Sequence, residues 1–227
     1  MEDRIGGLPD SLLFHILSFL QTKDVVATCM LSKRWRHLWR LPSKLHFDDR
    51  SFPSVEFFVQ FIDAALRLVR LNSVQMFVLK CERFSVLEVE VNVWVNALTN
   101  YKLTYLKLHF RRQLILLPSS FFIYNTVSVL KLTGFVLVNL SPVDLPSLKA
   151  LHLKNVKFSN SKCIARLLSY CLHLEELVLK GLKVRFEFEH REDECARFEH
   201  LLFADVPAFL FPMEVFSNVQ FIYLRQL

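Results

Sequence analysis

Residues 8–20 read Leu-Pro-Asp-Ser-Leu-Leu-Phe-His-Ile-Leu-Ser-Phe-Leu, and residues 31–39 read Leu-Ser-Lys-Arg-Trp-Arg-His-Leu-Trp. In the first stretch the apolar residues recur with the spacing of a helix that buries one side. Asp10 is predicted to cap this helix, Thr22 to cap a second helix and Ser32 a third. Pro42 is expected to end the third helix. Residues 8–41 are therefore predicted to form three short helices.

This segment holds more apolar side chains than three short helices can bury among themselves. The surplus consists of Leu8, Leu12, Ile16, Leu17 and Leu20. Such a surplus indicates a docking surface for another protein. The alternative is an ordinary helical core that caps the rest of the chain.

The Leu-Pro start, the aliphatic spacing and the Ser-Lys-Arg-Trp-Arg-x-Leu-Trp ending together resemble an F-box of the plant type that precedes leucine-rich repeats. The resemblance implies binding to the Skp adaptor of a cullin-based SCF ubiquitin ligase, and gives Trp35 the role of holding the helices in register. Plant relatives of this type often carry a further C-terminal FBD domain, which this chain is expected to lack. By position, the adaptor-binding residues would be Leu8, Pro9, Leu12, Ile16, Leu17, Leu20, Leu31 and Trp35.

From residue 74 onward an apolar-x-x-apolar-x-apolar pattern recurs, with the spacing of leucine-rich repeats, roughly 20–29 residues. The last two residues of each triplet alternate as in a strand that buries one side. The seven triplets are Val74/Phe77/Leu79, Leu103/Leu106/Leu108, Val127/Leu130/Leu132, Leu148/Leu151/Leu153, Leu174/Leu177/Leu179, Phe198/Leu201/Phe203 and Val219/Ile222/Leu224.

The predicted fold class is α+β or α/β, a solenoid with a three-helix F-box at residues 1–45. A helical bridge at 46–73 joins it to an irregular leucine-rich-repeat arc at 74–227, with about seven repeats of which the last is incomplete. One repeat cannot bury its apolar side alone, so neighbouring repeats must stack. Stacking places a parallel sheet on the concave side of the arc.

Residues between the buried strand positions are expected to point to the concave surface, where parallel strands add their charges into one field. In the sixth repeat the same pattern places Leu202 and Ala204 there. We expect this basic surface to bind an acidic or phosphorylated target protein; the alternative is that its lysines only keep the sheet soluble. The predicted target-binding residues are Tyr105, Lys107, His109, Lys131, His152, Lys154 and Lys180.

Composition excludes several other functions. The chain has 22 Phe and only 4 Gly, and these glycines form no nucleotide-binding motif. Its five cysteines are odd in number and form no C-x-x-C pair, which favours reduced thiols in the cytoplasm and/or nucleus. Neither a signal peptide nor a membrane span is predicted, despite a mean hydropathy of +0.30. No catalytic constellation, metal site or cofactor site is predicted either.

We therefore expect a non-catalytic substrate-recognition subunit of an SCF-type E3 ubiquitin ligase. Its partners would be a Skp-type adaptor, a cullin bound through that adaptor, and a target protein, with no nucleic acid and no membrane. The alternative is a leucine-rich-repeat scaffold without ligase function, whose architecture is degenerate or truncated. A third possibility is a sensor in which a small ligand completes the target site.

Overall fold

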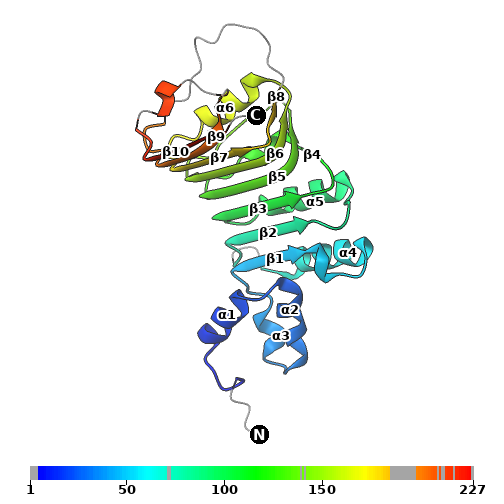
Figure 1. The fold of residues 1–227 in the computed structure, drawn as a ribbon. Coiled ribbons are helices and arrows are strands. Elements are labelled where there is room, and N and C mark those ends of the chain that lie inside the picture. The colour runs from blue at the N-terminus through cyan, green and yellow to red at the C-terminus, as the bar shows by residue number, and fades with distance from the viewer. Residues whose placement is uncertain are drawn as a thin grey trace.

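The computed structural model describes residues 5–70, 73–138, 140, 142–184, 198–208, 210, 213–216 and 218–225. A helical N-terminal segment is followed by a parallel sheet of ten strands (Figure 1). Among the described residues, no helix combines the length and the apolar character needed to span a membrane.

The N-terminal segment contains α1 (Asp10–Ser18), α2 (Thr22–Ala27), the 3-10 turn η1 (Thr28–Met30) and the short α3 (Trp35–Leu38). Its core is formed by buried side chains from all three α-helices, namely Leu13, Leu17, Val25, Trp35 and Leu38.

All three predicted helix caps are wrong. Asp10 lies inside α1 and pairs with Arg34. The Thr22 hydroxyl accepts a hydrogen bond from the backbone N–H of His46 at 2.7 Å, which ties α2 to the sheet. Helix α3 begins at Trp35 with no side-chain cap, so Ser32 does not cap it. The first two side chains make longer-range bonds instead of local caps.

The strands of the sheet follow the order of the chain, with two short strands at its side. The main path is β1 (Lys44–Asp48), β2 (Met76–Cys81), β3 (Tyr105–Phe110), β5 (Val129–Leu137), β6 (Ala150–Phe158), β7 (Glu176–Lys180), β9 (Phe203–Pro207) and β10 (Phe221–Arg225). Strand β4 (Ile115–Leu117) pairs with β5, and β8 (Lys183–Val184) pairs with β6. Leu106, Leu130, Leu151 and Leu177 lie in register on successive strands and are completely buried. The apolar pattern therefore predicted the buried side of these strands correctly.

The sheet begins one strand earlier than predicted. Leu45 and Phe47 of β1 are buried and pair in register with Phe77 and Leu79. Strand β1 crosses the predicted boundary between residues 45 and 46, and the domain limits themselves stay a prediction. The triplet pattern missed β1 because Pro42 stands where the other triplets have an aliphatic residue.

The predicted register of the sixth repeat is wrong by three residues. Ala204 pairs with Leu177 and is completely buried, so the triplet is Leu201, Ala204 and Val206. Ala204 therefore does not point outward, whereas Phe203 and Asp205 occupy the outward positions of β9. The error arose because a small alanine fills a position that holds leucine in the neighbouring strands.

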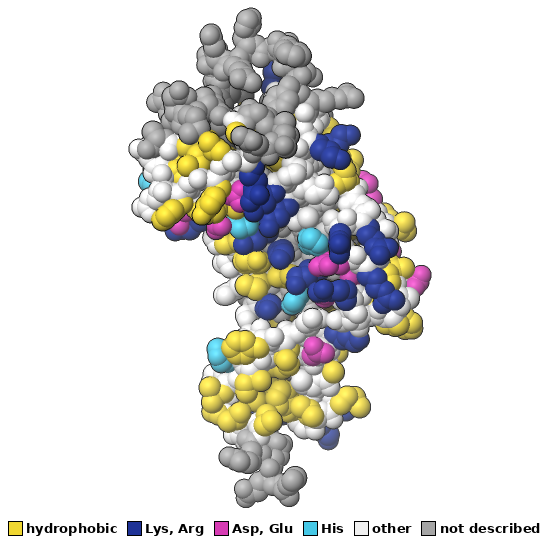
Figure 2. Space-filling view, in the orientation of Figure 1, with side chains coloured by type: hydrophobic (Ala, Val, Ile, Leu, Met, Phe, Trp, Pro, Cys, Tyr) yellow, Lys and Arg dark blue, Asp and Glu magenta, His cyan; other side chains and the backbone are white. Residues whose placement is uncertain are grey.

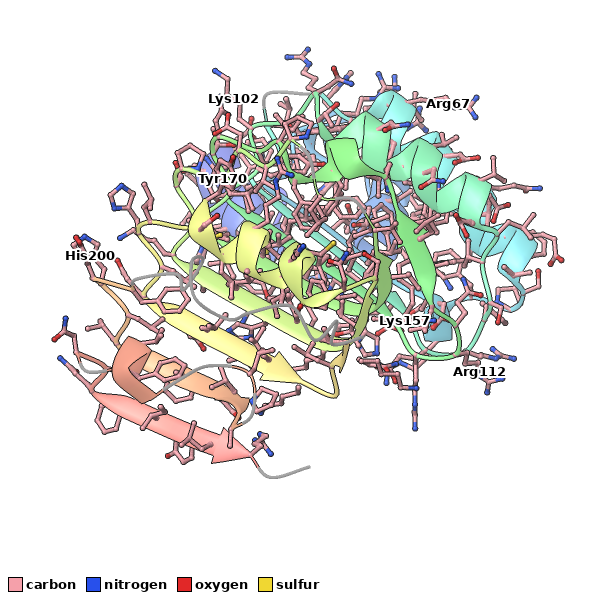
Figure 3. The ribbon with its side chains drawn as sticks, turned by 90° about the horizontal axis from the view of Figure 1, so that it is seen from above. Arg67, Lys102, Arg112, Lys157, Tyr170 and His200 are labelled. Carbon is pink, nitrogen blue, oxygen red and sulfur yellow. The ribbon has the colours of Figure 1, made fainter. Side chains whose placement is uncertain are left out.

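Among the described helices, those that follow β1 lie on one side of the sheet and leave its other face without a covering helix (Figure 3), whereas α1 to α3 lie beyond its β1 end (Figure 1). The helices on the covered side are α4 (Val55–Leu68), α5 (Glu88–Leu98) and α6 (Ser161–Ser169). The chain also contains the 3-10 turns η2 (Asp49–Ser51), η3 (Ser119–Phe122) and η4 (Met213–Phe216). The Phe58 and Trp94 rings pack edge to face with centroids 6.5 Å apart. The Trp94 indole N–H donates to Asp63 Oδ1 at 2.7 Å, which fastens α5 to α4. Phenylalanine thus fills the layer between the helices and the sheet.

Three successive strands are followed or interrupted by a residue in the left-handed region. Thr133, Lys154 and Lys180 lie in register, and the residues directly after them are Gly134 (φ 83°), Asn155 (φ 50°) and Gly181 (φ 60°). A Cβ atom on Gly134 would lie 2.1 Å from the Phe110 carbonyl oxygen, whereas one on Gly181 would meet nothing closer than 3.6 Å. Only at Gly134 do both the positive φ angle and the lack of space for a Cβ atom require glycine.

Gly134→Ala is expected to lower the free energy of unfolding by about 3 kcal/mol, because left-handed strain and a backbone clash add. Gly181→Ala is the matched control, since it adds the strain without the clash and should cost about 1 kcal/mol. Urea denaturation of both variants measures the difference. Equal losses would contradict the close approach of Gly134 to Phe110.

Candidate functional site

The N-terminal segment exposes several large apolar side chains, which we call the apolar surface. Figure 2 shows hydrophobic side chains gathered at the N-terminal end of the molecule. The set consists of Ile5, Leu12, Ile16, Phe19, Met30 and Leu31. Such a patch on a small helical unit marks a protein-interaction surface.

Arg34 holds the chain that leads into α1. Its guanidinium donates to the carbonyl oxygens of Gly6 and Leu8, the latter at 2.7 Å. Its Nε–H donates to Asp10 Oδ1 at 3.0 Å. These bonds position Leu8 and Pro9 beside α1, so Arg34 is a positioning residue of the apolar surface. The sequence pattern did not single it out.

The uncovered face of the sheet, which we call the open face, carries all seven residues predicted to bind a target. Lys107 of β3 pairs with Lys131 of β5, which pairs with His152 of β6. Two residues further along, His109, Thr133, Lys154 and Lys180 also form a row across neighbouring strands. Adjacent strands are roughly 4.8 Å apart. Residues far apart in the sequence thus form a compact basic grid, visible as dark blue and cyan side chains in Figure 2.

Carboxylates lie at the margins of this grid. Glu176 Oε1 lies 2.9 Å from His152 Nε2, and Asp205 Oδ2 lies 2.7 Å from Lys180 Nζ. Asp205 also binds the Arg225 guanidinium, and hydrogen bonds from Arg225 are the largest of the effects that lower its pKa. Sequence analysis missed Asp205 because the register of β9 was predicted incorrectly.

Comparison with known protein families agrees with both parts of this geometry. A family model described as an F-box domain matches residues 5–47. A second model, described as the leucine-rich repeats of FBD-associated F-box protein At5g56370, matches residues 91–199. The chain thus combines an F-box with leucine-rich repeats of the type found in FBD-associated F-box proteins.

Curated relatives of this F-box/leucine-rich-repeat protein come from Arabidopsis thaliana. F-box/FBD/LRR-repeat protein At4g26340 is 37% identical over 189 residues, covering 78% of this chain and 44% of the relative. FBD-associated F-box protein At4g10400 is 37% identical over 183 residues, covering 78% and 45%. F-box protein At4g09920 is 37% identical over 187 residues, covering 80% and 59%. The chain thus spans about half the length of these relatives. No solved structure matches it.

The structure places the predicted adaptor-binding residues of the F-box in three environments. Pro9 is exposed together with Leu12, Ile16 and Leu31, whereas Leu8 and Leu20 are half-buried. Leu17 and Trp35 are only 6% and 4% exposed and belong to the helical core. For Trp35 this agrees with the predicted role of holding the helices together, whereas Leu17 presents little surface to a partner.

Two prominent residues of the apolar surface were missed by sequence analysis. Phe19 is 73% exposed and Met30 is 89% exposed. Phe19 directly follows α1, and Met30 ends η1. Phe19 lies three residues after Ile16, but the predicted stripe was continued through Leu20 instead, and Met30 lies outside that stripe. Their exposure, which the sequence does not reveal, is what marks them.

His46 lies where the F-box meets the sheet, and its pKa is lowered to about 4, first by burial and then by Lys80 and Lys44. Lys107 adds to this effect, whereas Asp48 opposes it. The unfolded chain binds a proton to histidine near pH 6.5, and the folded chain does so only near pH 4. The stability that neutral His46 supports is therefore present above pH 6.5 and is lost between pH 6.5 and pH 4.

We expect the free energy of unfolding to fall when the pH is lowered through this window. The variant His46→Gln should reduce that fall by about 1 kcal/mol, a value that allows for solvent screening of the partly exposed side chain. Urea denaturation at pH 7 and at pH 5 tests this, with His15→Gln as a control on the exposed side of α1. Identical pH dependence in the parent chain and in His46→Gln would contradict it.

Proposed function

We propose that this protein is the substrate-recognition subunit of an SCF-type E3 ubiquitin ligase. F-box domains generally bind Skp-type adaptors, and the apolar surface offers such an adaptor a site that the chain itself leaves uncovered. Through the adaptor the protein would join a cullin. The observation that carries the proposal is this exposed apolar surface on a segment that matches an F-box.

The open face is the proposed target-binding surface. The repeats form an irregular arc with the sheet on its concave side, and seven predicted residues share that side. The basic grid suits an acidic or phosphorylated target protein. The protein would perform no chemistry itself; it would hold the target near the transferring enzyme, and the rate gain would come from proximity. The proposed compartments are the cytoplasm and/or the nucleus, where reduced cysteines are the rule.

Co-expression with a plant Skp-type adaptor tests the adaptor contact. The double variant Leu12→Arg/Ile16→Arg should reduce co-purification at least about tenfold, because it puts charge into an apolar interface. Both side chains are exposed on α1, so the fold should be unaffected. The matched control is Val89→Arg/Val93→Arg, two exposed aliphatic residues of α5 that lie outside the F-box match.

Undiminished co-purification of the Leu12→Arg/Ile16→Arg chain would count against this assignment of the interface. Failure of the unaltered chain to bind any Skp-type adaptor would favour the alternative, a leucine-rich-repeat scaffold outside the ligase. In either case, circular dichroism of the two double variants shows whether the helices are intact.

A further inference from the structure

Four lysines come together in the middle of the open face, and we call them the lysine cluster: Lys80, Lys107, Lys131 and Lys154. Lys107 lies directly opposite Lys131 on the neighbouring strand. Lys80 and Lys154 belong to the adjoining row, on the strands that flank this pair. Each comes from a different strand, so only the folded sheet produces the cluster.

The lysine cluster differs from the other basic residues around it. Lys180 pairs with Asp205 at 2.7 Å, Arg50 pairs with Asp48 at 2.7 Å, and Arg111 lies 3.9 Å from Glu82. Within the described part of the chain, none of the four clustered lysines forms an ion pair. Lys131 instead lies 5.9 Å from the centre of the Tyr105 ring. These carboxylates thus pair with cations outside the lysine cluster.

This arrangement is unfavourable in the protein alone. Like charges directly opposite each other on a sheet are destabilising. The pKa of Lys107 is lowered first by burial and then by the charges of Lys80, Lys131 and Lys154, whereas Glu82 opposes this effect. Lysines that served only solubility would gain from dispersal among acidic residues. An anion bound at the centre would turn this repulsion into attraction.

Thr133 lies at the centre of the lysine cluster. It is two residues beyond Lys131 on β5 and pairs with His109 on one side and Lys154 on the other. Its side chain is half-buried. A hydroxyl can donate a hydrogen bond to an oxyanion, and ammonium groups act on phosphate as point charges. The surroundings therefore provide one donor hydroxyl within a ring of cations.

We propose that the lysine cluster, with Thr133 at its centre, binds a phosphate monoester on a segment of the target protein. A phosphate monoester carries about −1.5 to −2 charges at pH 7, so it can be shared by several lysines in a way that one carboxylate cannot. The assignment of the phosphate to a target rests on the proposed function. The binding of the phosphate itself does not.

The probe is an acetylated, amidated Gly-Gly-phosphoserine-Gly-Gly peptide, added to the full chain, purified with its adaptor where needed. Calorimetry should show binding that weakens as salt rises, and the melting temperature should increase with the peptide. The same peptide with Glu in place of phosphoserine should bind at least about tenfold more weakly. Equal binding of the Glu peptide would overturn the preference for phosphate. Inorganic phosphate that binds as tightly as the phosphopeptide would overturn its assignment to a protein segment.

Lys107→Met and Lys131→Met should each weaken phosphopeptide binding about tenfold, yet raise the melting temperature of the ligand-free chain. The second effect separates a binding role from a structural one, because loss of a structural lysine would lower that temperature. Lys102→Met is the control, because it makes the same charge change at a lysine that precedes β3 and does not belong to the lysine cluster. Figure 3 shows Lys102 and Arg112 at opposite ends of this strand. Unchanged affinity in Lys107→Met and Lys131→Met, or an equal loss in Lys102→Met, would overturn the proposal.

Adaptor co-purification separates this proposal from the proposed function. The lysine variants should retain the adaptor, because the lysine cluster lies on the sheet and the apolar surface lies on the N-terminal helices. If the chain binds the phosphopeptide but no adaptor, the result supports the phosphate site and contradicts the proposed ligase function. If the chain binds the adaptor but not the phosphopeptide, the result contradicts the phosphate site and leaves the proposed ligase function unaffected.

Discussion

The in-register pairing of parallel strands is the constraint on which the rest of the molecule depends. A strand such as β3 buries Leu106 and Leu108 only because strands on both sides place their own apolar residues at the same level. The same pairing fixes the outward residues with equal strictness, since side chains alternate along each strand. Lys107 and Lys131 are neighbours because Leu106 and Leu130 are neighbours. The core therefore dictates the pattern of charges on the open face.

The segment that carries the apolar surface is joined to the sheet by side-chain hydrogen bonds. The His46 backbone bonds to the Thr22 hydroxyl, and Ser51 Oγ bonds to Gln21 Oε1 at 2.9 Å. The F-box helices therefore attach directly to the first strand of the sheet. A target held on the open face would be held at a defined position relative to the adaptor, which is the geometric requirement for catalysis by proximity.

Most of the sheet could be predicted from the sequence because leucine recurs at the paired buried positions of β3, β5, β6 and β7, and the outward positions of these strands followed from it. The prediction failed where a local residue broke the pattern: Pro42 concealed β1, and Ala204 shifted the predicted register of β9. The roles of Arg34, Phe19 and Asp205 depend on distant partners or on exposure. No pattern of neighbouring residues encodes those properties.

The column of left-handed residues at Gly134, Asn155 and Gly181 marks the same level in three successive repeats. Beyond it, β5 and β6 still pair in register, and the short strands β4 and β8 pair beside them. The segments that then return the chain to the next strand differ in length and structure. Insertions and deletions in the returning segments can therefore accumulate without displacing any side chain on the open face. The side chains presented on the open face and the length of a repeat are therefore structurally independent of each other.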